Sequence, residues 1–89
     1  MLFMNINDLI AIVKEKLQKN ILIEKIVVED KSFLHKNHLS HQKGKFHLKL
    51  TITSAALKKL NRINSDKKIY KILDQELKEH IHSLQILIR

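Results

Sequence analysis

Histidine is the residue type in this sequence best suited to carry chemistry. Six histidines are present, and His35, His38 and His41 recur at every third position of a polar stretch. His47 follows at the start of an alternating segment, and His82 begins the last apolar segment. Neutral imidazole is a common ligand for zinc, iron and copper. Loop histidines near His82 therefore predict a metal site, with a solvated polar loop as the structural alternative, because the spacing matches no standard zinc pattern.

His82 holds an unusual position in the last segment. Alternation places it on the same side as Leu84, Ile86 and Ile88, so an imidazole begins a strand whose face is otherwise apolar. One interpretation is structural, a hydrogen-bonded histidine where a helix joins a strand. The other is functional, with a ring nitrogen acting as metal ligand or proton carrier.

Enzyme chemistry finds little support in the sequence. There is no cysteine and a single glycine, which excludes a thiol nucleophile and a glycine-rich phosphate loop. No serine lies in a nucleophile-elbow context. Asp74, Glu76 and Glu79 lie at helical pairing distance from lysines, as on an ordinary exposed helix face. We expect a protein that is not an enzyme, in which any metal is bound by His or carboxylate, or is shared with a partner that supplies thiolates.

The net charge of +8 is unevenly distributed along the chain. No acidic residue occurs between Asp30 and Asp66, whereas the basic residues there are Lys31, Lys36, Lys43, Lys45, Lys49, Lys58, Lys59 and Arg62. This pattern indicates either a footprint for phosphates or an acidic protein, or a biased composition with solvated lysines. The opening four residues are too short for a signal peptide, and no apolar run approaches the span of a bilayer. We expect a soluble, cytoplasmic protein without a membrane partner.

The first half of the chain predicts one helix and two strands. Asn7 is a suitable N-cap for a helix that ends near Asn20. Its apolar side consists of Ile6, Leu9, Ile10, Val13 and Leu17. The β-branched residues of 21–30 predict a strand centred on Lys25 to Glu29, and a loop follows over 31–45. Residues 46–53 then alternate and predict a strand, with the outward positions His47, Lys49, Thr51 and Thr53.

The second half predicts two helices before the last strand. Ser54 is a suitable N-cap for a short helix whose apolar residues are Ala56, Leu57, Leu60 and Ile63. Ser65 begins a second helix through about Lys78, with a core stripe of Ile69, Ile72, Leu73 and Leu77. The order helix-strand-strand-helix-helix-strand, without linker or repeat, predicts a single α+β domain over 1–89 with the helices on one side of a three-stranded sheet.

An ordered set of motifs across the chain resembles the BolA family. The motifs are Val28 to Ser32 leading into Leu34-His35-x-x-His38, Phe46-His47-Leu48-Lys49, Ser54, Ile69-Tyr70, Asp74 to Leu77, and His82-Ser-Leu84. The resemblance covers nearly the whole chain from about Asn7. It implies a fold similar to the class II KH domain, with a mixed three-stranded sheet, and a monomer in isolation.

The resemblance also implies a function in iron–sulfur or iron handling beside a monothiol glutaredoxin. In the family, the histidine that matches His82 and a loop His or Cys bind a bridged [2Fe–2S] cluster, while the glutaredoxin contributes a cysteine and its glutathione. The isolated chain would then bind no cluster. His38 is the first choice for the second ligand, followed by His35, His41 and His47. His80 is expected to cap the preceding helix at its C-terminus.

A nucleic-acid-binding transcriptional regulator is the alternative that the sequence leaves open. DNA would bind the basic segment from Lys58 to Lys71, through Lys58, Lys59, Arg62, Lys67, Lys68 and Lys71. Two departures from the family weaken this alternative: the Arg-His-Arg run before the long helix reads Ser65-Asp66-Lys67, and a common glycine is replaced near Lys59. The RNA-binding mode of KH domains needs a GxxG loop, which this sequence lacks.

Overall fold

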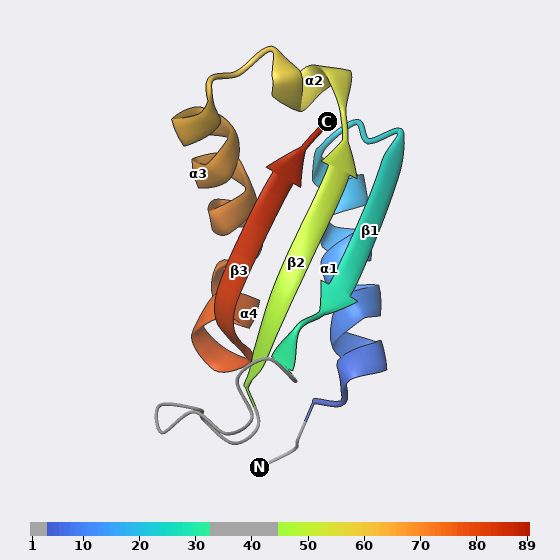
Figure 1. Ribbon diagram of the computed structural model, residues 1–89, viewed down its shortest axis with the longest axis vertical. Coiled ribbons are helices and arrows are strands. Elements are labelled where there is room, and N and C mark those ends of the chain that lie inside the picture. Colours follow the sequence, from blue (N-terminus) through green and yellow to red (C-terminus); the bar gives the residue numbers. More distant parts are fainter. Residues whose placement is uncertain (1–3, 33–44) are drawn as a thin grey trace.

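The computed structural model describes residues 4–32 and 45–89, and the chain forms an α+β fold (Figure 1). Its elements in chain order are α1 (Ile6–Asn20), β1 (Lys25–Asp30), β2 (Phe46–Thr53), α2 (Ala55–Lys58), α3 (Arg62–Ile72), α4 (Asp74–Glu79) and β3 (Ile81–Ile88). The predicted order of helices and strands is confirmed, except that the last predicted helix is divided in two. None of the helices in the described ranges is long and apolar enough to cross a membrane.

The three strands form one mixed sheet with β2 in the centre. β1 pairs antiparallel with β2, and β3 pairs parallel with β2. The residues 46–53 predicted as a strand are those of β2, because their strict alternation matches a strand with one buried face. The predicted centre of the first strand, Lys25 to Glu29, lies within β1.

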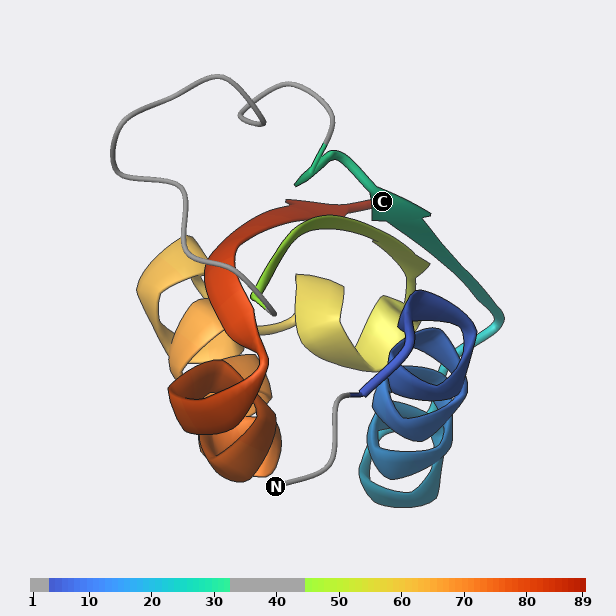
Figure 2. The same ribbon diagram turned by 90° about the horizontal axis from the view of Figure 1, so that it is seen from below.

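All four helices lie on one face of the sheet, and no described helix covers the other face (Figure 2). The core fills the space between the sheet and the helices. It consists of Leu9, Val13, Leu17, Ile21, Val28, Leu48, Leu50, Ile52, Leu57, Ile69, Leu73, Ile81 and Ile86. Burial of this aliphatic layer is the main stabilising contribution to a domain of this size.

The first helix begins two residues earlier than predicted. Asn5 is the N-cap of α1, and its Oδ1 accepts a hydrogen bond of 2.9 Å from the Asp8 backbone N–H. The prediction of Asn7 was wrong because either asparagine is a suitable cap by type, and Ile6 is already within the helix. The predicted end at Asn20 is confirmed.

Two N-caps were predicted after β2, and the structure confirms one prediction and shows the other to be wrong. Ser54 caps α2 as predicted, and its Oγ both accepts from the Leu57 N–H and donates to the Leu22 carbonyl. The next helix is capped by Asn61 instead of Ser65. Ser65 is buried inside α3 and donates to the Arg62 carbonyl. As a result Ile63 lies on the exposed side of α3, outside the predicted apolar stripe.

The predicted long helix is divided at Leu73 into α3 and α4. The ψ angle of Leu73 is 18°, well away from the α-helical value of about −42°. The core stripe is nevertheless confirmed, since Ile69 and Leu73 are buried and Ile72 and Leu77 pack against the core. His80 is the C-cap of α4, as predicted, and leads directly into β3.

Candidate metal-binding site

The start of β3 is irregular, and the irregularity determines where His82 points. Phe46 pairs with Ile81, but the next residue, His47, pairs with Ser83, so His82 is the extra residue of a β-bulge in β3. Bulges interrupt the alternation of side chains and redirect them. Ile81 is buried in the core and His82 is exposed. The predicted placement of His82 on the apolar face with Leu84 was therefore wrong.

His47 lies opposite the bulge and is fixed from both sides. Its Nδ1 is 2.6 Å from Ser83 Oγ on β3, and its backbone N–H donates to Ser32 Oγ at 3.0 Å. Its carbonyl accepts a 2.7 Å bond from the Lys31 N–H. Alternation places the ring on the helix-free face, yet only 6% of the residue is exposed. The predicted outward direction holds, but the expected exposure does not, and the ring lies against Ser83 and His82 of β3.

The rings of His47 and His82 are in direct contact. Their centroids are 4.9 Å apart and their planes are inclined by 65°. Two imidazoles bound through nitrogen at about 2.1 Å to one tetrahedral metal would have centroids roughly 5 Å apart. The spacing of the two rings is therefore compatible with binding of the same metal ion.

The two rings differ in accessibility. His82 is exposed, whereas the Nε2 atom of His47 is buried. An incoming metal would therefore meet His82 first. For His47 to bind through Nε2, its proton must be on Nδ1 and donate to Ser83 Oγ, the orienting arrangement common for metal-binding histidines.

The other predicted ligands, His35, His38 and His41, lie outside the described residues. Ser32, which precedes the residues that are not described, accepts a hydrogen bond at its Oγ from the backbone N–H of His47. Within residues 4–32 and 45–89, no group of three or more His, Asp, Glu or Cys side chains is placed to hold a metal ion. In this part of the chain the candidate donors are the His47–His82 pair.

One of the acidic side chains predicted to lie on an exposed helix face is buried. Glu76 is buried, and its Oε2 lies 2.6 Å from Lys16 Nζ on α1. The prediction of an exposed helix face was wrong for Glu76, because its partner is distant in the sequence and no local pattern signals it. Asp74 does pair with Lys78 at 3.0 Å, as the helical spacing predicts.

Comparison with known proteins identifies the family. The family model for BolA-like protein matches residues 17–89. The chain belongs to the BolA family. The DNA-binding transcriptional regulator BolA of Haemophilus influenzae is 31% identical over 75 residues, which cover 84% of this chain and 70% of that relative. The sequence resemblance is thereby confirmed.

Solved BolA structures share the fold. The BolA domain of SufE1 from Arabidopsis thaliana has a TM-score of 0.77 and 29% identity, and the match covers 97% of this chain and 93% of that one. BolA1 from Arabidopsis thaliana has a TM-score of 0.74 and 26% identity, over 89% of this chain and 87% of that one. A second curated match, SufE-like protein 1 from Arabidopsis thaliana, is 30% identical, and the match spans 22% of that longer protein.

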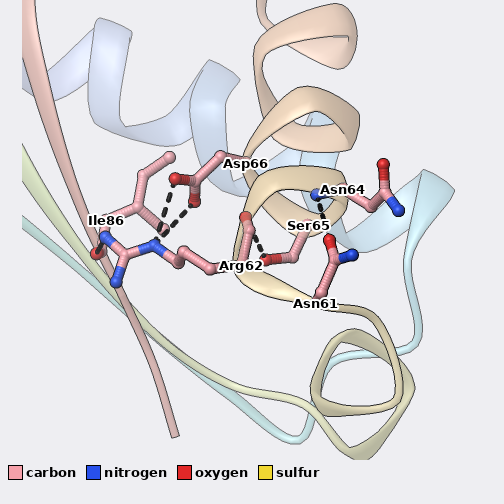
Figure 3. Close-up of polar contacts among 6 residues, drawn as sticks. All are labelled: Asn61, Arg62, Asn64, Ser65, Asp66 and Ile86. Atoms are coloured by element: carbon pink, nitrogen blue, oxygen red, sulfur yellow. Dashed lines mark hydrogen bonds and ion pairs between the residues drawn. The ribbon is translucent and has the colours of Figure 1, made fainter.

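The basic segment of this BolA-family chain is exposed, and Arg62 is the member of it that makes hydrogen bonds to neighbouring residues. Lys58, Lys59, Lys67, Lys68 and Lys71 are all exposed. Arg62 pairs with Asp66 through Nε at 3.1 Å and donates from Nη2 to the Ile86 carbonyl at 3.0 Å (Figure 3). The lysines are therefore available to a polyanion, whereas Arg62 already has two partners.

Proposed function

We propose that this chain is a non-enzymatic partner of a monothiol glutaredoxin, with which it shares or relays a [2Fe–2S] cluster. The observation that carries the proposal is the exposed His82 ring in contact with His47. The two rings sit at a β-bulge beside the face of the sheet that no described helix covers. A partner can approach His82 there without disturbing the core.

The donor set supports a shared cluster. The chain has no cysteine, so sulfur ligands must come from the partner's cysteine and its glutathione. Imidazole is a neutral donor, and replacing thiolate by imidazole on one iron raises the reduction potential of a [2Fe–2S] cluster. The shared cluster should therefore be easier to reduce than one bound by thiolates alone.

Each residue has a separate task in this proposal. His82 provides the accessible nitrogen, and Ser83 holds the His47 ring at the pair. One of the loop histidines, with His38 first, remains the alternative to His47 as second ligand. Because a histidine must be neutral to bind metal, the mixed complex should weaken in mild acid.

The test is a titration of a cluster-loaded monothiol glutaredoxin with this chain. We expect a visible absorption and circular dichroism spectrum unlike that of the glutaredoxin homodimer, because nitrogen replaces sulfur on one iron. His82→Ala should abolish the difference. His80→Ala is the matched control, since His80 is two residues away and serves as the C-cap of α4. A normal mixed spectrum with the His82 variant would remove His82 from the site.

DNA binding is the second candidate function. It is supported by the name of the Haemophilus influenzae relative, a DNA-binding transcriptional regulator, and by the exposed lysines of the basic segment. Affinity for duplex DNA should fall steeply with salt, because each neutralised phosphate releases counterions. A Lys58→Ala/Lys59→Ala variant should lose affinity for all sequences alike. Cluster sharing without measurable binding to DNA would eliminate this candidate.

A further inference from the structure

A small pocket lies at the far end of β3 from His82, and we call it the α3 pocket. Its lining has an apolar part and a polar part, which are Leu57, Leu60, Leu87 and Ile88, and Lys58, Arg62 and Ser65. Its volume is about 220 Å³. Ligand sites for whole small molecules usually have about 300 Å³ or more, so this pocket is of a size for a single side chain.

The charged residues that line the α3 pocket are both cations. No carboxylate lines it, and Lys58 makes no ion pair within the described residues. Arg62 is paired with Asp66, so Lys58 carries the uncompensated charge. A pocket that combines aliphatic residues with two cations in its lining complements an aliphatic side chain that has a carboxylate beside it.

Arg62 is held in a fixed position although it is largely exposed. Nε is bound by both oxygens of Asp66, and Nη2 is bound by the Ile86 carbonyl, as Figure 3 shows. The side chain remains 65% exposed. Nη1 has no hydrogen-bond acceptor in the described part of the chain. A guanidinium that is already ordered loses little entropy when it binds a further carboxylate.

We infer that the α3 pocket is a docking socket for an acidic segment of a protein partner, which inserts one aliphatic side chain between Leu60 and Leu87 and places a carboxylate at Lys58 and Arg62. The apolar residues of the lining are all aliphatic, and no aromatic side chain among residues 4–32 and 45–89 lines the pocket. Unpaired bases of nucleic acids are usually bound by stacking on aromatic rings, so the chemistry favours a protein segment.

The socket is separate from the histidine pair. Leu87 lies five residues after His82 on β3, roughly 17 Å away at about 3.3 Å per residue. A second protein could therefore dock at the α3 pocket while a glutaredoxin occupies the histidine end. The inference does not depend on the cluster, because it uses none of the histidines.

The test is an NMR titration of the isotope-labelled full chain, without cluster, with a capped peptide of glutamates around one leucine. We expect amide shifts at Leu60, Arg62 and Leu87, and weak binding in the millimolar range or tighter. The same peptide with alanine in place of leucine should bind several-fold more weakly, since it leaves the pocket unfilled. Absence of shifts at millimolar peptide would overturn the inference, as would equal binding of both peptides.

Charge reversal provides the matched variants. Lys58→Glu should weaken peptide binding about fivefold, the upper range for an exposed charge contact. Lys59→Glu makes the same change one residue further on, outside the pocket lining, and should have a much smaller effect. Equal losses in the two variants would indicate attraction to the general basic surface. Displacement of the peptide by a duplex oligonucleotide that shifts the same amides would assign the pocket to nucleic acid.

Discussion

The two ends of β3 are built in different ways from the same strand. At its start the pairing with β2 is irregular, and the extra residue His82 points into solvent beside a buried His47. At its end the pairing is regular, and Leu87 and Ile88 contribute apolar walls to the α3 pocket. β3 runs from the histidine pair to the α3 pocket. A single strand therefore carries nitrogen donors at one end and aliphatic residues beside cations at the other.

The comparison indicates which parts of the molecule can be altered independently. The histidine end follows α4, which the Lys16–Glu76 pair ties to α1. The pocket end is tied to α3 by the bond from Arg62 to the Ile86 carbonyl. The Lys16–Glu76 ion pair and the Arg62–Ile86 hydrogen bond each lie at one end of β3. Removing either interaction should therefore destabilise that end first.

The largest effect is expected from Lys16. Replacing it by methionine leaves the Glu76 carboxylate buried without its cation, and breaking a buried pair in this way costs roughly 3 kcal/mol of unfolding free energy. Glu76→Gln should cost less, about 1 kcal/mol, because the Lys16 side chain is 37% exposed and can reach water. Urea denaturation measures both values. A larger loss for Glu76→Gln than for Lys16→Met would contradict the assigned burial.

Arg62→Ala should have the next largest effect, about 1 kcal/mol, because it removes the bonds to Asp66 and to the Ile86 carbonyl. Faster amide hydrogen exchange should be confined to the end of β3 and to α3, while the amides around His82 keep their protection. Arg62→Lys is the control. It retains the positive charge but loses the planar guanidinium that donates to Asp66 and to the Ile86 carbonyl together. Faster exchange at both ends would mean that they are not independent.

Ser83→Ala tests how the His47 ring is held. We expect a loss of about 1 kcal/mol or less, the usual contribution of one hydrogen bond, and a changed tautomer ratio of His47 by nitrogen NMR. Ser83→Thr should restore the ratio because it keeps the hydroxyl. An unchanged ratio in the alanine variant would show that Ser83 does not orient the ring.

His82→Ala should have the smallest effect on stability, within about 0.5 kcal/mol, because the side chain is exposed. Its thermal unfolding should therefore match that of the His80→Ala control closely. Such a result makes any loss of cluster sharing attributable to the missing ligand. A strongly destabilised His82 variant would instead support the structural interpretation of this histidine.

Prediction from sequence succeeded where a local pattern decides the structure. β2 follows from the strict alternation of Phe46 to Thr53, and Ser54 as a cap follows from its type and position. Prediction failed where the local structure depends on a residue that is distant in the sequence. The bulge at His82 depends on the register with β2, and the burial of Glu76 depends on Lys16, which lies 60 residues earlier.

For the candidate site, the sequence indicated the residue types but not their relation. His82 and His47 were both expected as ligands, yet nothing in the sequence placed one ring against the other. The orienting bond from Ser83 was missed, since serine in a strand has no distinctive spacing. Arg62 was assigned to a DNA surface by charge alone, and its bonds to Asp66 and Ile86 become visible only in the fold.

The most direct measurement of the proposed function is pulsed electron paramagnetic resonance of the reduced mixed complex. The chain would carry nitrogen-15 in its histidines, and the glutaredoxin would be unlabelled. Strong hyperfine coupling to two nitrogen-15 nuclei is expected, and His82→Ala, which abolishes the mixed spectrum, should leave no nitrogen-15 coupling. A cluster whose strongly coupled ligands are all sulfur, with no nitrogen-15 signal from this chain, would contradict the proposal.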